Sequence, residues 1–245
     1  MSLKSLFHIS LLWTASLCCL ILYGIATLYI SLAYDLPDAR ILKTSEGIAT
    51  LLDTGPDGER KSSPSIRALS FDGIPPQVLD AFQASMGPYL LADDPPPFRD
   101  GCGIILPHAL ARKLLGSANL RTYSRILKQG ILAWHIHISL SPEEMFAAWV
   151  STVYLGNGNF GLVEAVDFYF SKQIAELTIA EAAVLASIPF APTKFNPLKH
   201  PELISERRAW VLGRMRDYGM ITPEELAEAL ASPLIQPRTK ATRNP

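Results

Sequence analysis

Positively charged side chains concentrate between Gly101 and Trp134, a stretch that contains no Asp or Glu. Read as a helix, it places Arg121, Arg125 and Lys128 at i, i+4 and i+7, on one face. Arginine binds phosphate oxygens bidentately, so this face is suited to a phosphate or an anionic lipid headgroup, although an ordinary solvated helix face explains the same pattern. The chain has two basic clusters, and the same two interpretations apply to each. The first is Arg112, Lys113, Arg121, Arg125 and Lys128, and the second is Arg207, Arg208, Arg214 and Arg216.

Other familiar chemistries lack their residue patterns in this sequence. His135 and His137 are two residues apart and point to different sides of a helix, and no H-E-x-x-H or paired-cysteine spacing accompanies them. A nucleophile elbow, a P-loop and a dinucleotide fingerprint are also missing. The sequence therefore indicates no metal site and no evident cofactor.

The composition excludes several classes of protein. The chain has 245 residues, of which 49% are hydrophobic and 18% charged, with a formal net charge of −1. These values exclude a disordered tail, a collagenous or repeat fibre and a strongly basic nucleic-acid binder. Length and composition predict one folded domain plus a short additional segment.

That additional segment is the apolar N-terminus, which has no Asp, Glu, Lys or Arg from Ser5 to Tyr34. About 20 apolar residues span a bilayer as a helix, whereas the apolar core of a cleavable signal peptide has roughly 7–15. We therefore predict an uncleaved single-pass anchor over residues 1–34. Lys4 before the span and Asp35 and Asp38 after it place the N-terminus inside and the remaining residues outside.

The rest of the chain is predicted to be mainly α-helical. Residues 35–73 are rich in Asp, Gly, Ser and Pro and form a linker with room for short strands, for example at 48–52. Three helix starts carry a hydroxyl cap three residues before a Glu, at Ser141, Thr178 and Thr222. Loops are expected at 93–97, 156–161 and 188–197, a folded domain over 74–232 and a tail over 233–245.

The helix after Ser141 has a plain apolar face. Its large apolar side chains recur at spacings of one, three and four residues, which predicts one buried side, formed by Met145, Phe146, Trp149, Val150, Val153 and Tyr154.

Six segments follow one another with the order and spacing of a known family: 74–82, 154–164, 169–172, 177–183, 191–197 and 206–215. Together they resemble glycosyltransferase family 51, the transglycosylase domains of bifunctional penicillin-binding proteins and of monofunctional biosynthetic peptidoglycan glycosyltransferases. The resemblance covers roughly residues 35–230.

The resemblance implies a lysozyme-like helical fold with a membrane-proximal lobe, on one N-terminal transmembrane helix. It implies polymerisation of lipid II on the periplasmic or extracellular side of a bacterial cytoplasmic (inner) membrane, for peptidoglycan biosynthesis and the cell wall. The partners of this protein would be lipid II or a glycan strand, the membrane and a cell-wall synthesis protein, with no nucleic acid. Some members of the family use a divalent cation. The chain ends at Pro245, so no transpeptidase domain is expected.

The residues that would carry the family's chemistry are replaced. The family's E-D-x-x-F-x-x-H motif supplies the catalytic base, and this chain has Met86 and Gly87 in place of Glu and Asp, with Asp93 in place of His. In the R-K-x-x-E motif Arg125 is retained, but Lys is Ile126 and the second Glu is Gln129. Gly87 and Pro88 should also end the preceding helix at this point.

Two further motifs have lost polar groups, and a last one is intact. The glycine-rich G-G-S-T-I-x-Q-Q motif corresponds to residues 102–109, where Ile104 and Ile105 replace Ser and Thr, and His108 and Ala109 replace both Gln. The usual Lys of the fourth motif is Pro142, whereas Arg207 and Arg208 of the fifth are retained. Residues expected to build the scaffold therefore match, while residues expected to touch the reacting atoms do not.

Three hypotheses follow. The first is a membrane-anchored pseudoenzyme, catalytically inactive or impaired, that binds lipid-linked precursor, glycan strand or a cell-wall synthesis partner, with phosphate held by Arg125, Lys128, Arg207, Arg208 and Arg112. The second is an active peptidoglycan glycosyltransferase with a displaced general base, for which Asp93 and Asp94 are the nearby acids. The third is an anchored structural subunit without glycan contact, whose old cleft presents Ile104, Ile105 and Leu106 as an apolar patch.

Overall fold

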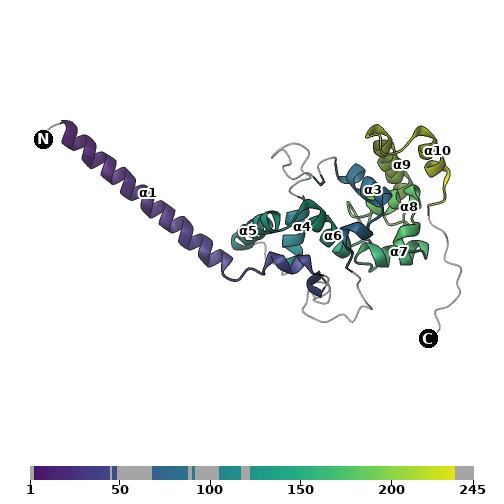
Figure 1. Cartoon of the computed structure of the whole chain (residues 1–245), viewed down its shortest axis with the longest axis horizontal. Coiled ribbons are helices and arrows are strands. Elements are labelled where there is room, and N and C mark those ends of the chain that lie inside the picture. Colours follow the sequence, from purple (N-terminus) through teal and green to yellow (C-terminus); the bar gives the residue numbers. More distant parts are fainter. Residues whose placement is uncertain are drawn as a thin grey trace.

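The computed structural model describes residues 3–44, 46–48, 68–87, 90–91, 105–116 and 122–234, and in these residues the regular structure is helical. Figure 1 shows a long N-terminal helix, α1, projecting from a bundle of shorter helices. The prediction of a mainly α fold is confirmed. The elements are α1 (Leu3–Ala33), η1 (Ala39–Lys43), η2 (Phe71–Gly73), α3 (Pro76–Met86), α4 (Ile105–Leu114), α5 (Tyr123–Ser139), α6 (Pro142–Thr152), α7 (Leu162–Phe170), η3 (Ile174–Glu176), α8 (Ile179–Ser187), α9 (Pro201–Asp217) and α10 (Pro223–Ala231).

Helix α1 has the length and composition of a membrane span. Its segment Ser16–Ala33 has a mean hydropathy of 2.0, and none of it is buried against the rest of the protein. An apolar helix of this length whose side chains are exposed agrees with the predicted anchor, and insertion in a membrane stays a prediction.

The region between the anchor and the domain contains short helical turns. The described residues of 35–73 form η1, capped by the Asp38 side chain, and η2. Of the β-like run at 48–52 only Ile48 is described, and it lies in a helical turn. The predicted domain boundaries stay predictions.

The three predicted helix starts are confirmed as capping boxes. The Ser141 hydroxyl accepts a hydrogen bond from the backbone N–H of Glu144 at 3.2 Å, and the Glu144 carboxylate accepts one from the backbone N–H of Ser141 at 2.9 Å. Thr178 pairs with Glu181 and Thr222 with Glu225 in the same reciprocal way. Each pair satisfies two backbone donors that the helix itself leaves open.

Two helix ends bear on the sequence predictions. Helix α3 ends at Met86 as predicted, with Gly87 at a φ of 124°, a conformation that favours glycine. Helix α6 ends at Thr152, so the predicted continuation of its buried face to Val153 and Tyr154 is wrong. Val153 is extended, and Tyr154 pairs with Phe160 across a turn.

The core forms around α8. Residues Ala180–Ser187 are all buried, because α8 packs on α3, α9, α7 and α10. Beside it, α3 and α6 share an aromatic cluster in which the Phe82 ring lies 5.8 Å from Phe146 and 5.6 Å from Trp149, centroid to centroid. In Figure 1, α5 lies nearest to α1, and α9 and α10 lie at the opposite end of the bundle.

Candidate functional site

Helix α5 is docked against the end of α1. The Tyr29 hydroxyl of α1 and Nε2 of His135 are 2.7 Å apart, and Lys128 Nζ lies 3.6 Å from a carboxylate oxygen of Asp35. On its other side α5 packs on α4, and α4 packs on α6. The basic segment therefore lies where the chain leaves the predicted membrane span.

The predicted phosphate-binding cations of this segment fall on two helices. Arg125 and Lys128 lie within α5, and Arg112 is exposed on α4. The Arg125 guanidinium donates to the carbonyl of Gly116, just after α4. Helix α5 begins at Tyr123, so the predicted i, i+4, i+7 face can be followed here for Arg125 and Lys128, and Arg121 lies outside the described residues.

Neither family base position presents a carboxylate. Met86 is the last residue of α3, partly buried and packed against the core. The Gln129 side-chain amide on α5 donates to the backbone carbonyl of His108 on α4 at 3.3 Å, so it links these two helices. The suggested surrogate acids, Asp93 and Asp94, lie outside the described residues.

The second pair of predicted cations lies at the other end of the molecule. Helix α9 packs on α3, α8 and α10, whereas α4 and α5 pack on one another and toward α6 and α1. Arg208 is buried, and its guanidinium donates to the carbonyls of Ser232 at 2.9 Å and Leu230 at 3.3 Å. Because these are open carbonyls at the end of α10, Arg208 serves there as a C-terminal cap.

The structure also draws attention to Lys113, whose neighbours the sequence alone did not reveal. Its Nζ donates to the carbonyl of Thr152 and lies 5.2 Å from the centroid of the Phe160 ring. Burial lowers the pKa of Lys113 to about 8. Its spacing in the sequence could have indicated this burial, because Lys113 follows the buried Leu106 and Leu110 at intervals of four and three residues, on the same face of a helix.

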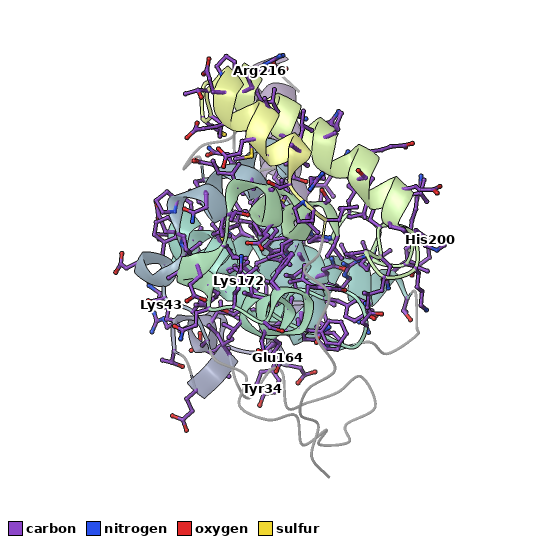
Figure 2. The ribbon with its side chains drawn as sticks, turned by 90° about the vertical axis from the view of Figure 1, so that its right-hand side faces the viewer. Tyr34, Lys43, Glu164, Lys172, His200 and Arg216 are labelled. Carbon is purple, nitrogen blue, oxygen red and sulfur yellow. The ribbon has the colours of Figure 1, made fainter. Side chains whose placement is uncertain are left out.

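Glu164, in the first turn of α7, is the second group that the sequence analysis did not single out. Burial raises the pKa of its carboxyl, and a hydrogen bond from the backbone of Phe160 opposes part of that rise. Its Oε1 is buried without a hydrogen-bond partner among the described residues. Figure 2 views this side of the domain, with Glu164 below Lys172. A carboxyl in such an environment is the type of group that enzymes use for proton transfer.

In the described parts of the chain, no three His, Cys, Asp or Glu side chains come close enough to hold a metal ion. The positive charge at the candidate site comes from arginine and lysine side chains. Arg125 and Lys128 lie on α5, the helix that contacts the end of α1, and Arg112 lies on α4. Guanidinium and ammonium groups of this kind are suited to anionic ligands.

Comparisons with known proteins find a matching family and several similar proteins. Residues 106–216 match a family model described as Transglycosylase. Penicillin-binding protein 1A of Aquifex aeolicus is 39% identical over 132 residues, which cover 54% of this chain and 18% of that protein. A protein of Cupriavidus necator described as a transglycosylase is 36% identical over 114 residues, covering 46% of this chain and 49% of that protein.

The chain thus matches less than half of the length of these relatives. Among solved structures, penicillin-binding protein 1A from Haemophilus influenzae aligns with a TM-score of 0.40 and 26% identity, over 68% of this chain and 18% of that one.

Proposed function

On the premise that this chain carries a transglycosylase domain of glycosyltransferase family 51, which the family match shows, we propose that it is a membrane-anchored protein of peptidoglycan synthesis that binds lipid-linked precursor without polymerising it. In this proposal α1 spans the cytoplasmic membrane once, and the helical domain lies on its outer side. The family scaffold supplies the binding surface, and the glycosyl-transfer chemistry is lost.

The proposed loss of glycosyl-transfer activity rests on one observation. Glycosyl transfer between sugars needs a carboxylate that takes the proton from the attacking hydroxyl. The two positions at which the family places a Glu hold Met86, packed against the core, and Gln129, whose amide is hydrogen-bonded to α4. A thioether cannot accept a proton at neutral pH, and a primary amide is a very weak base.

The surface of α5 supports a position at the membrane boundary. Trp134 and Ile138 are 62% and 63% exposed although they are large and apolar, and Tyr123, Ile126 and Leu127 are exposed as well. Exposed apolar and aromatic side chains interleaved with cations are typical of helices that lie in the headgroup region. Because α5 is bonded to the last turns of α1, this surface lies at the depth at which α1 would leave the bilayer.

A lipid-linked diphosphate carries its charges at this same depth in the membrane. A diphosphate between a lipid tail and a sugar headgroup lies at the boundary of the bilayer, and it is recognised by guanidinium and ammonium groups. Arg125 and Lys128 are present there on one helix, and Lys128 pairs with the exposed Asp35 at 3.6 Å. An ion pair of this kind is weak and can be replaced by a ligand of higher charge.

Replacing Arg125 and Lys128 together by Gln is expected to weaken lipid II binding by about 10²–10⁴-fold, because two charge-assisted hydrogen bonds are lost and each contributes about 1.5–3 kcal/mol. The measurement is a titration of lipid II into nanodiscs that contain the full-length chain. Lys199→Gln together with Arg216→Gln is the matched control, because it removes the same charge at and just before α9, far from α1. Equal binding by the two double variants would refute a diphosphate site on α5.

A further inference from the structure

Helix α9 carries a continuous stack of alternating aromatic rings and guanidinium groups. The Arg207 guanidinium carbon lies 3.8 Å from the centroid of the Trp210 ring and 4.9 Å from that of Phe190. The Arg214 guanidinium lies 4.8 Å from Trp210 and 5.1 Å from Tyr218. We name this set the arginine ladder; its members are Phe190, Arg207, Trp210, Arg214 and Tyr218.

The spacing of α9 explains how the arginine ladder forms. Arg207, Trp210, Arg214 and Tyr218 follow one another at intervals of three, four and four residues, which aligns them along one stripe of the helix. Phe190 comes from the loop after α8 and covers the first guanidinium. The four ladder positions of α9 include two arginines and no acid, with Glu206 and Asp217 at adjacent positions and Asp217 paired with Arg216. Lys194 lies 5.4 Å from the Phe195 ring, which also contacts Arg207, so positive side chains outnumber negative ones here.

The rings of the ladder are open to solvent rather than part of the core. Phe190 is 75% exposed and Trp210 is 42% exposed, and Tyr218 is exposed too. Burial, and secondarily the charge of Arg214, lower the pKa of Arg207, and the Arg207 Nε is buried with no hydrogen-bond partner among the described residues. Two guanidinium groups side by side repel one another, so an anion placed on the ladder would relieve that repulsion.

The position of the ladder argues against lipid as its ligand. Figure 1 shows α9 and α10 at the end of the bundle remote from α1. In Figure 2, which looks onto that end, His200 and Arg216 mark the two ends of α9. If α1 spans the bilayer, α9 faces away from it, toward the space that the extended glycan polymer occupies.

We propose that the arginine ladder binds a peptidoglycan strand, with a sugar ring on the open face of Phe190 and the carboxylates of stem peptides on Arg207 and Arg214, the two guanidinium groups that Trp210 holds between them. Flat, exposed aromatic rings are suited to the apolar faces of pyranose rings, and arginine is suited to carboxylates in bidentate geometry. The strand is an acidic polymer, so its charge is complementary to the acid-free stripe. This proposal rests on the proposed function, because it adds a site for the polymer to the site for the precursor.

The test uses the full-length chain in nanodiscs and fluorescently labelled, uncrosslinked glycan strands, prepared with and without their stem peptides. Phe190→Ala is expected to weaken binding of both strands by about tenfold, the loss typical of removing an aromatic anchor. Trp210→Ala removes the ring between the two guanidinium groups and should weaken binding only of strands that carry peptides. Arg214→Gln should weaken binding only of strands that carry peptides. Trp134→Ala, at the α1 end, is the matched control and should leave strand binding unchanged.

Several outcomes would overturn the proposal. The first is equal strand binding by Phe190→Ala, Trp210→Ala and Trp134→Ala. The second is ladder-dependent binding to protein-free anionic vesicles instead of strands. The third is an equal effect of Arg214→Gln on both strands. Lipid II binding is measured on the same variants and should not change in Trp210→Ala. If the ladder variants lose strand binding and keep lipid II binding, the ladder proposal is supported. If no variant binds lipid II but strand binding still depends on the ladder, the result refutes only the precursor site on α5.

Discussion

Phe82→Ala is expected to lower the free energy of unfolding by about 3–5 kcal/mol, as large-to-small changes of buried aromatic residues do. Phe82 is fully buried, and its ring contacts Phe146 and Trp149 edge to face at 5.8 and 5.6 Å. The change removes both the apolar burial and these aromatic pairs, and leaves a cavity between α3 and α6. The measurement is urea unfolding of the full-length chain in detergent, followed by tryptophan fluorescence.

Phe190→Ala is the matched control for this prediction. Phe190 is 75% exposed, so its removal should change the free energy of unfolding by less than about 0.5 kcal/mol. An equal loss of stability in the two variants would show that α3 and α6 do not share the aromatic core described above.

The second large effect concerns Lys113 and pH. Burial lowers the pKa of Lys113 to about 8 from an ordinary 10.5, so between these values the unfolded chain binds a proton that the folded chain does not. The contribution of Lys113 therefore makes the protein more stable as pH rises from about 8 to 10.5, by about 3 kcal/mol in total, and has no slope below pH 8.

The check is to measure the free energy of unfolding against pH for the native chain and for Lys113→Met. Other lysines and tyrosines titrate in the same range, so the difference between the two curves isolates Lys113. We expect Lys113→Met to be the more stable protein at pH 7, with the difference shrinking above pH 8. A difference that is constant from pH 7 to 10 would show that Lys113 keeps its ordinary pKa.

Local signals in the sequence predicted local structure well. The capping boxes at Ser141, Thr178 and Thr222 were confirmed because each is made by residues three positions apart. Gly87 ended α3 as predicted, because its φ of 124° suits glycine and the residue after it is Pro88. The family resemblance was confirmed by a match of residues 106–216 to the Transglycosylase family model.

Features that depend on distant residues could not be predicted in this way. Arg207 and Arg208 are adjacent and alike in sequence, yet one is stacked on rings from α9 and the loop at 190–195, and the other caps α10. Their difference follows from which side of α9 is buried and from what packs there. Lys113 likewise has a lowered pKa because it is buried, beside Thr152 and Phe160, which are 39 and 47 positions away in sequence.

The central claim is that a transglycosylase scaffold binds lipid II without polymerising it. The most direct test adds labelled lipid II to nanodiscs containing the full-length chain and measures bound lipid II and glycan-strand length in the same sample, beside an active penicillin-binding protein 1A. We expect saturable binding, and polymer formation slower by at least about 10²–10⁴-fold, the usual cost of losing a general base. Strands of similar length formed at a similar rate would contradict the claim and assign catalysis to another acid of this chain.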